Sequence, residues 1–180
     1  MVDLIITPRQ SIGPFKLGAS RDEIRAAAVE AGISIGHDRE NMDYFLKNGV
    51  QVSYDRGFAD FIGVSTSADY RALYRGIDIS DVPALDLFQM AADADGSGPH
   101  VFNEYEYCFP NQILTLWGVD DQYDRIRRRF GGELRPMWAQ VGIGTSGYLE
   151  VRRKYDESIL RLSASDAPGK LSSLTKRTSQ

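Results

Sequence analysis

A glycine-rich segment near the end of the chain has the spacing of a dinucleotide-binding motif. Residues 142–147 read Gly-Ile-Gly-Thr-Ser-Gly. In a dinucleotide site such glycines let the backbone approach a pyrophosphate, between a parallel strand and its crossover helix. Little chain remains to build that unit, and residues 148–151 continue as an expected strand. We therefore interpret the segment as a hairpin turn and predict no cofactor.

An acidic segment, Asp93 to Glu104, matches part of a calcium-binding loop. Asp93, Asp95 and Ser97 occupy the first, third and fifth positions, with a glycine sixth and Glu104 twelfth. His100 stands where such loops usually carry a branched residue, and a strand is expected to follow instead of a helix. The segment is either a Ca²⁺ site or a flexible acidic loop. We favour the loop and predict no metal.

The chain has two histidines, His37 and His100, and one cysteine, Cys108. Both histidines lie in polar, loop-like surroundings without the paired spacing of metal ligands, so we interpret them as solvated. Cys108 lies in an aromatic run typical of a buried strand, which favours an inert thiol over a nucleophile. We predict no catalytic residue and favour a non-enzymatic role.

A charged segment, residues 120–132, is expected to form a short insertion helix. Its acidic residues near the start and its arginines near the end follow the helix dipole, so a structural role is sufficient. The arginines could also bind carboxylates or phosphates. Aromatic side chains occur within and outside this segment, and they are either suited to binding hot spots or, for most of them, simply part of the core. From these two sets we predict the following partner-binding residues: Tyr70, Tyr74, Trp117, Asp120, Asp121, Tyr123, Arg127 and Arg128.

Charge and hydropathy narrow the class of protein. The 21 basic and 25 acidic residues give a net charge of -4, which disfavours a nucleic-acid partner because phosphate binding usually needs a basic excess. The N-terminal apolar stretch breaks at Thr7-Pro8, too early for a secretory signal. No stretch approaches the ~18 apolar residues of a membrane-spanning helix. We expect a cytoplasmic protein with no membrane contact.

The first half of the chain predicts one helix and three strands. Ser20 and Glu23 have the spacing of a capping box, so a helix should begin at Arg21 and end at Gly32. Asn48-Gly49 between two apolar runs predicts a hairpin with a type I′ turn. Bulky and β-branched residues over 58–66 predict a third strand.

The second half repeats this order. Ser80 is expected to cap a helix whose buried face is Leu85, Phe88, Ala91 and Ala92. A hairpin at Pro110-Asn111 and a strand over 138–144 follow. The repetition reflects either duplication of one unit, over residues 8–68 and 78–154, or coincidence.

These elements predict an α+β fold with a predominantly antiparallel sheet and two packed helices, plus the short insertion helix. We expect a single domain over residues 1–162 and a mobile tail over 163–180.

Residues 11–25 read Ser-Ile-Gly-Pro-Phe-Lys-Leu-Gly-Ala-Ser-Arg-Asp-Glu-Ile-Arg. This segment resembles the helix-start signature of small bacterial α+β proteins, with Ala19 in place of their usual methionine. Similar openings occur in β-lactamase-inhibitor-protein-like folds, in outer-membrane-assembly lipoproteins and in immunity proteins of toxin systems. The signature marks a helix start and transfers no functional residue.

The resemblance, the acidic balance and the lack of a catalytic motif lead to one functional hypothesis: a non-catalytic protein-binding domain, of the immunity type, that inhibits a bacterial toxin as its cognate partner. An alternative is a small enzyme or ligand-binding protein, with Arg127 to Arg129 holding an anionic molecule in a cleft between the halves and His100 as base. A third is a module that self-associates through edge strands. The oligomeric state is left open.

Overall fold

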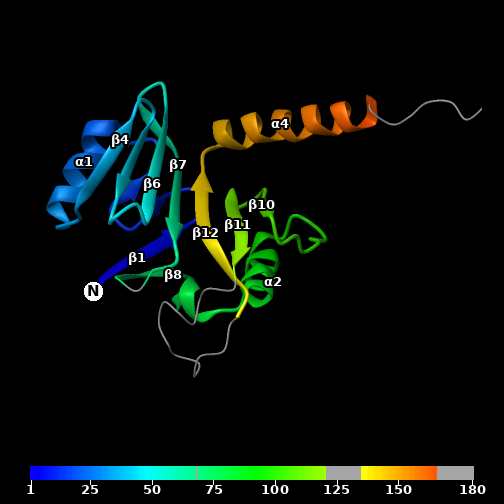
Figure 1. The fold of residues 1–180 in the computed structure, drawn as a ribbon, viewed down its shortest axis with the longest axis horizontal. Helices are drawn as coiled ribbons and strands as arrows, with labels where there is room; N and C mark the ends of the chain where they lie inside the picture. Colours follow the sequence, from blue (N-terminus) through cyan, green and yellow to red (C-terminus); the bar gives the residue numbers. More distant parts are fainter. Residues whose placement is uncertain (68, 121–134, 166–180) are drawn as a thin grey trace, which may run out of the picture. The chain divides into compact units, whose positions relative to one another are not determined.

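The computed structural model describes residues 1–67, 69–120 and 135–165. The chain divides into two compact units, Met1–Leu149 and Glu150–Gln180. Among its described residues, the first unit holds two β-sheets and two complete α-helices (Figure 1). The predicted α+β class with predominantly antiparallel strands is confirmed.

The larger sheet has seven strands in the order β10-β11-β12-β7-β6-β5-β4. Its strands are β4 (Ile35–Arg39), β5 (Met42–Phe45), β6 (Val50–Asp55), β7 (Phe58–Ser65), β10 (Glu106–Phe109), β11 (Leu114–Asp120) and β12 (Met137–Gly144). The meanders β5-β6-β7 and β10-β11-β12 meet where β7 pairs antiparallel with β12, side by side in Figure 1. Gly63 and Gly142 are partners in this central pair. Duplication remains a prediction, but the two meanders form one continuous sheet.

The smaller sheet has the order β3-β2-β1-β8-β9. Its strands are β1 (Val2–Thr7), β2 (Ser11–Ile12), β3 (Phe15–Lys16), β8 (Tyr70–Tyr74) and β9 (Ile77–Asp78). Strands β1 and β8 pair in parallel, and every other pairing among the described strands is antiparallel. This sheet therefore links the first strand of the chain to the segment between the two meanders.

Helix α1, Arg21–Glu30, begins and ends as predicted. The Ser20 side chain accepts from the backbone N–H of Glu23, and the Glu23 carboxylate accepts from the backbone N–H of Ser20, which completes the capping box. Gly32 follows the helix with a φ of 67°, a left-handed conformation that glycine adopts without strain. The helix packs against β3, β4 and β7.

Helix α2, Ala84–Asp95, begins later than predicted. Pro83 precedes it, and Ser80 lies in a separate 3₁₀ turn, Ile79–Asp81, capped by Asp78, so the prediction that Ser80 caps the helix is wrong. The buried face also differs: Leu85 is exposed and Leu87 is buried. The proline locks its own φ and carries no N–H, so it can stand directly before the first turn.

Both predicted hairpins are present, but the Asn48-Gly49 turn is not type I′. Phe45 pairs with Val50, so the loop has four residues, and positive φ occurs at Leu46, Lys47 and Asn48 but not at Gly49. Glycine is needed at position 49 because a Cβ there would overlap the phenol of Tyr70.

The glycine segment 142–147 leads into a helix, so the predicted hairpin turn and the strand over 148–151 are wrong. Strand β12 ends at Gly144, and helix α4, Ser146–Ser165, begins two residues later. The Thr145 hydroxyl accepts from the backbone N–H of Tyr148 in the first turn. A dinucleotide unit is still not formed among the described strands, because β12 is antiparallel to both β11 and β7.

One continuous core joins both sheets and both helices of the first unit. It includes Leu4 from β1, Ile62 from β7, Phe88 from α2 and Val141 from β12. The two halves of this unit therefore share their hydrophobic core.

The expected boundary at residue 162 does not coincide with the end of the first unit at Leu149. Residues 163–165 continue helix α4, and 166–180 lie outside the described residues. The predicted insertion helix lies outside them also, except for Asp120 at the end of β11.

Candidate functional site

Trp117 is the aromatic residue among the predicted partner-binding residues that the structure places on the surface within the described residues. Its side chain is 54% exposed on β11, between its strand partners Glu106 on β10 and Gln140 on β12. These three side chains share the face of the large sheet opposite the core, which we call the outer face. Indole rings combine large apolar area with a hydrogen-bond donor, which suits them to protein interfaces.

The loop before β10, residues 97–105, adds exposed apolar side chains beside Trp117. Val101 is 78% exposed and Tyr105 is 75% exposed, and Phe102 is partly exposed. The Tyr105 carbonyl accepts from the Gly118 N–H at 2.7 Å, which places the end of the loop next to β11. We call residues 97–105 the presenting loop.

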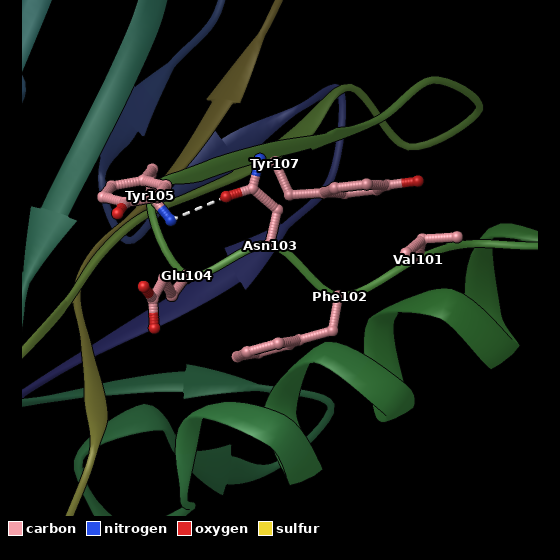
Figure 2. Close-up of a pocket in the computed structure, with 6 residues that line it drawn as sticks. All are labelled: Val101, Phe102, Asn103, Glu104, Tyr105 and Tyr107. Carbon is pink, nitrogen blue, oxygen red and sulfur yellow. Dashed lines mark hydrogen bonds between the residues drawn. The ribbon is translucent and has the colours of Figure 1, made fainter.

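Figure 2 shows how the presenting loop arches over helix α2, with Phe102 directed toward the helix. The Phe102 ring contacts Phe88 of α2 edge-on at a centroid distance of 5.4 Å. The Asn103 side chain accepts from the Tyr105 N–H at 2.9 Å and tightens the turn before β10. A pocket of about 690 Å³ is lined by residues of the loop and the start of β10: Val101, Phe102, Asn103, Glu104, Tyr105 and Tyr107.

A buried polar network holds the first part of the loop. The Asp95 carboxylate, buried at the end of α2, accepts from the Ser97 hydroxyl at 2.5 Å and from the Gln112 N–H at 2.8 Å. The His100 ring, whose side chain is largely buried, lies 2.9 Å from the Tyr107 hydroxyl through Nδ1. The prediction of a solvated His100 is therefore wrong.

The network also reaches the core. The Gln112 side chain donates to the Ala91 carbonyl of α2 and accepts from the Tyr74 hydroxyl. Because α2, the β10–β11 turn and the loop share these bonds, the exposed side chains are held in place before any partner arrives. Such pre-organisation lowers the entropy cost of binding.

We predict that Asp95→Asn loosens the presenting loop. The amide can replace only one of the two acceptor oxygens, so a charge-assisted hydrogen bond is lost and stability should fall by about 1.5 kcal/mol. Hydrogen exchange of the backbone amides of residues 97–105 should accelerate. The exposed Asp93, two residues earlier in the same helix, provides the control, since Asp93→Asn should change stability by less than about 0.5 kcal/mol. Unchanged exchange in Asp95→Asn would show that the network does not order the loop.

The other predicted site residues divide into three groups. Tyr70 and Tyr74 are each 1% exposed and belong to the core, so they cannot contact a partner in this structure. The Tyr70 hydroxyl donates to the carbonyls of Gly49 and Ser65. Asp120 is exposed at the end of β11. Asp121, Tyr123, Arg127 and Arg128 lie outside the described residues.

The arrangement around His100 is not a catalytic triad. Asp95 bonds directly to the Ser97 hydroxyl, whereas a triad carboxylate would orient the histidine. At the boundary between the halves, β7 and β12 are hydrogen-bonded neighbours, and the alternative of a ligand-binding cleft between the halves stays a hypothesis. Its arginines, Arg127 to Arg129, fall outside the described residues.

The remaining sequence candidates lie apart from one another. His37 is exposed on β4 and stacks on Tyr44, with ring centroids 4.3 Å apart. Cys108 is half-buried on β10, opposite Thr115. Among the described residues, no three acidic, histidine or cysteine side chains are grouped so that they could hold a metal ion. The Asp93–Glu104 segment consists of the C-terminal end of α2 and most of the presenting loop. The Asp95 carboxylate oxygens accept hydrogen bonds from the Ser97 hydroxyl and the Gln112 N–H.

Comparison with protein-family models, curated proteins and solved structures gives no match for this chain. The described helices include none with the length and apolar character required to cross a membrane.

Proposed function

We propose that the chain is a non-catalytic protein-binding domain that contacts its partner through the presenting loop and Trp117, and that it acts as an immunity-type inhibitor of a bacterial toxin in the cytoplasm. The observation that carries the binding proposal is the group of exposed apolar side chains Val101, Tyr105 and Trp117 on a loop and strand tied together by hydrogen bonds. The inhibitor role rests on the resemblance of residues 11–25 to small bacterial proteins.

The composition of this surface supports a protein partner. Tyrosine and tryptophan are the residue types most enriched at binding hot spots, because they bury much area and lose few rotatable bonds. Glu104 and Glu106 flank Tyr105 in the chain and are exposed. A surface with aromatic centres and acidic neighbours fits a partner whose complementary surface is apolar and basic.

The proposal is tested with the protein encoded next to this chain in its native genome. Co-expression should protect cells from that protein, and the purified pair should form a complex. A variant with Trp117→Ala and Tyr105→Ala should weaken binding at least about 30-fold, as expected when hot-spot side chains of ~2 kcal/mol are removed.

The matched control is Phe58→Ala. Phe58 is an aromatic side chain on β7 with 56% exposure, close to the 54% of Trp117. Because it lies outside the presenting loop and β11, its removal should leave the affinity for the partner unchanged. Equal loss of binding in both variants would exclude the presenting loop as the contact surface. Absence of any complex and of protection would contradict the immunity role.

A further inference from the structure

The pocket of the presenting loop has the size and lining of a site for a bulky apolar group. Its volume of about 690 Å³ lies within the usual range for ligand sites. Four of its six lining residues are aromatic or aliphatic, and the other two are Asn103 and Glu104. Such pockets bury an apolar group and use a few polar groups to orient it. This pocket therefore suits one large apolar side chain together with part of its backbone.

Contacts within the protein hold two of the lining rings in place. The Tyr107 ring packs edge-on against Phe88 at a centroid distance of 4.9 Å, and its hydroxyl lies 2.9 Å from Nδ1 of His100. The Phe102 ring packs against Phe88 at 5.4 Å and against Trp138 at 5.9 Å. Because these rings are already ordered, a side chain that enters the pocket gains contact area at a low entropy cost.

The other two apolar lining residues, Val101 and Tyr105, are largely exposed. Exposed apolar side chains grouped around a pocket are typical of interaction sites, because only a bound partner removes them from water. Tyr105 loses few rotatable bonds when it is covered. These two side chains should therefore contribute most of the apolar area that a ligand newly buries.

The charge around the pocket determines which residues fit next to the apolar side chain. Between Arg75 and Arg125 the sequence has ten acidic residues and no lysine or arginine. Glu104 lines the pocket and is exposed. Asp120 is exposed too, and it follows Val119, whose N–H donates to the Glu104 carbonyl at 2.9 Å. Such a surface attracts basic groups and repels acidic ones.

We propose that this pocket binds one bulky apolar side chain, flanked by basic residues, from an extended segment of the partner, an inference that rests on the proposed function. Figure 2 shows the side chains of Phe102 and Glu104 on the same side of the loop backbone. An apolar side chain in contact with Phe102 therefore brings a neighbouring lysine or arginine within reach of Glu104. Trp117 is not among the lining residues and adds contact area outside the pocket.

Capped peptides test the pocket without the partner. The peptide Gly-Lys-Phe-Lys-Gly is titrated into ¹⁵N-labelled protein. The comparison peptides are Gly-Lys-Ser-Lys-Gly, which lacks the apolar side chain, and Gly-Glu-Phe-Glu-Gly, which reverses the charge. The first peptide should shift the backbone N–H signals of residues 101–105 and the side-chain amide of Asn103. The side-chain amide of Gln51, which donates to Gln140 on the outer face, is the internal reference.

The lysine–phenylalanine peptide should bind at least about tenfold more tightly than either comparison peptide, because burial of a phenylalanine ring and charge complementarity each favour it. Tyr105→Ala should weaken this peptide at least about fivefold, as expected for loss of a large aromatic contact. The control is Leu85→Ala, since Leu85 is an exposed apolar side chain of α2 that does not line the pocket.

Glu104→Gln should reduce the preference for lysine over glutamate in the peptide, whereas Asp93→Asn, which removes an exposed charge on α2, should retain it. Equal binding of the serine peptide, shifts confined to other surfaces, or unchanged affinity in Tyr105→Ala would each overturn the inference. An unchanged charge preference in Glu104→Gln would overturn the assignment of the basic neighbours.

The two proposals fail separately. If Trp117→Ala weakens binding of the partner but the pocket does not distinguish phenylalanine from serine, the contact surface stands and the pocket assignment is wrong. If the pocket prefers the lysine–phenylalanine peptide but no partner complex forms, the pocket stands as a peptide-binding site and the immunity role is wrong.

Discussion

Asp43→Asn is expected to lower the free energy of unfolding by about 3 kcal/mol, the scale at which a buried ion pair is broken. The Asp43 side chain is fully buried on β5 and accepts from Arg21 and Arg25 of α1 and from the Tyr54 hydroxyl at 3.0 Å. The Arg21 Nη2–Oδ1 distance is 2.6 Å, and the Arg25 Nε–Oδ2 distance is 2.9 Å. An asparagine would turn an NH₂ group toward one of these donors, so both the charge and the acceptor would be lost.

The same network predicts how stability depends on pH. Burial alone would raise the pKa of the Asp43 carboxyl, but hydrogen bonds from Arg25, Arg21 and Tyr54 outweigh it and hold the pKa well below its usual range. An unfolded aspartate titrates near pH ~4. The stabilisation is therefore complete above about pH 4 and is lost as the pH falls through the lower folded-state pKa.

Urea unfolding followed by circular dichroism measures both effects. The stability difference between the wild-type protein and Asp43→Asn should be constant near neutral pH and shrink below about pH 4. Asp38 also contacts Arg25, at 2.8 Å, but its side chain is 61% exposed, so Asp38→Asn should cost about 0.5 kcal/mol or less. If the two variants lose the same stability, the buried network does not attach α1 to the sheet.

Local signals in the sequence identified the elements whose ends are determined by short-range contacts. The Ser20–Glu23 capping box and the left-handed Gly32 depend on residues within one helix turn, and both are present. The parallel pairing of β1 with β8 joins segments more than 60 residues apart, and no local pattern specifies which distant strands pair. That pairing could not be predicted from one sequence.

One misinterpretation and one omission had a visible signal. Tyr70, Ala72 and Tyr74 alternate with polar or less buried residues, which is the pattern of a half-buried strand. Both tyrosines are partner-binding candidates from the sequence, with the core as the alternative, which is where the structure places them. Asp43 likewise alternates in phase with Phe45, which places a charge on the core face, and the two arginines four residues apart on α1 are its natural partners.

The candidate site was only partly predictable. Trp117 was predicted, and it is exposed. The presenting loop looked like an acidic or calcium-binding segment, because its apolar residues Val101, Phe102 and Tyr105 are exposed only through the way the loop is anchored to α2 and β11. Anchoring through Asp95 and Gln112 depends on tertiary contacts, which sequence spacing does not reveal.

Gly142 belongs both to the predicted strand over 138–144 and to the glycine segment 142–147 interpreted as a turn, and the structure places it inside strand β12. A Cβ at Gly142 would overlap the Phe61 ring and lie 2.7 Å from the Thr115 hydroxyl oxygen. Phe61 is nearly buried and stacked on Tyr148, so it has little space to move. Gly142→Ala should therefore lower the free energy of unfolding by about 2 to 3 kcal/mol through overpacking.

Gly63, the strand partner of Gly142, is the matched comparison. A Cβ there meets only the flexible end of the Gln140 side chain, which can rotate away, and alanine also reduces the backbone entropy lost on folding. Gly63→Ala should change stability by less than about 1 kcal/mol. Thermal and urea unfolding of the two variants measure the difference in stability. Equal losses would mean that backbone packing, and not contact with the Phe61 ring, destabilises Gly142→Ala.

A double-mutant cycle identifies the cause in Gly142→Ala. If the new methyl collides with the Phe61 ring, adding Phe61→Leu should recover part of the lost stability, because the smaller side chain frees the space above Gly142. The cycle should then give an interaction energy of about 1 kcal/mol or more in the favourable direction. Additive losses would place the strain at Thr115 instead, and Thr115→Ala in the Gly142→Ala background would then restore stability.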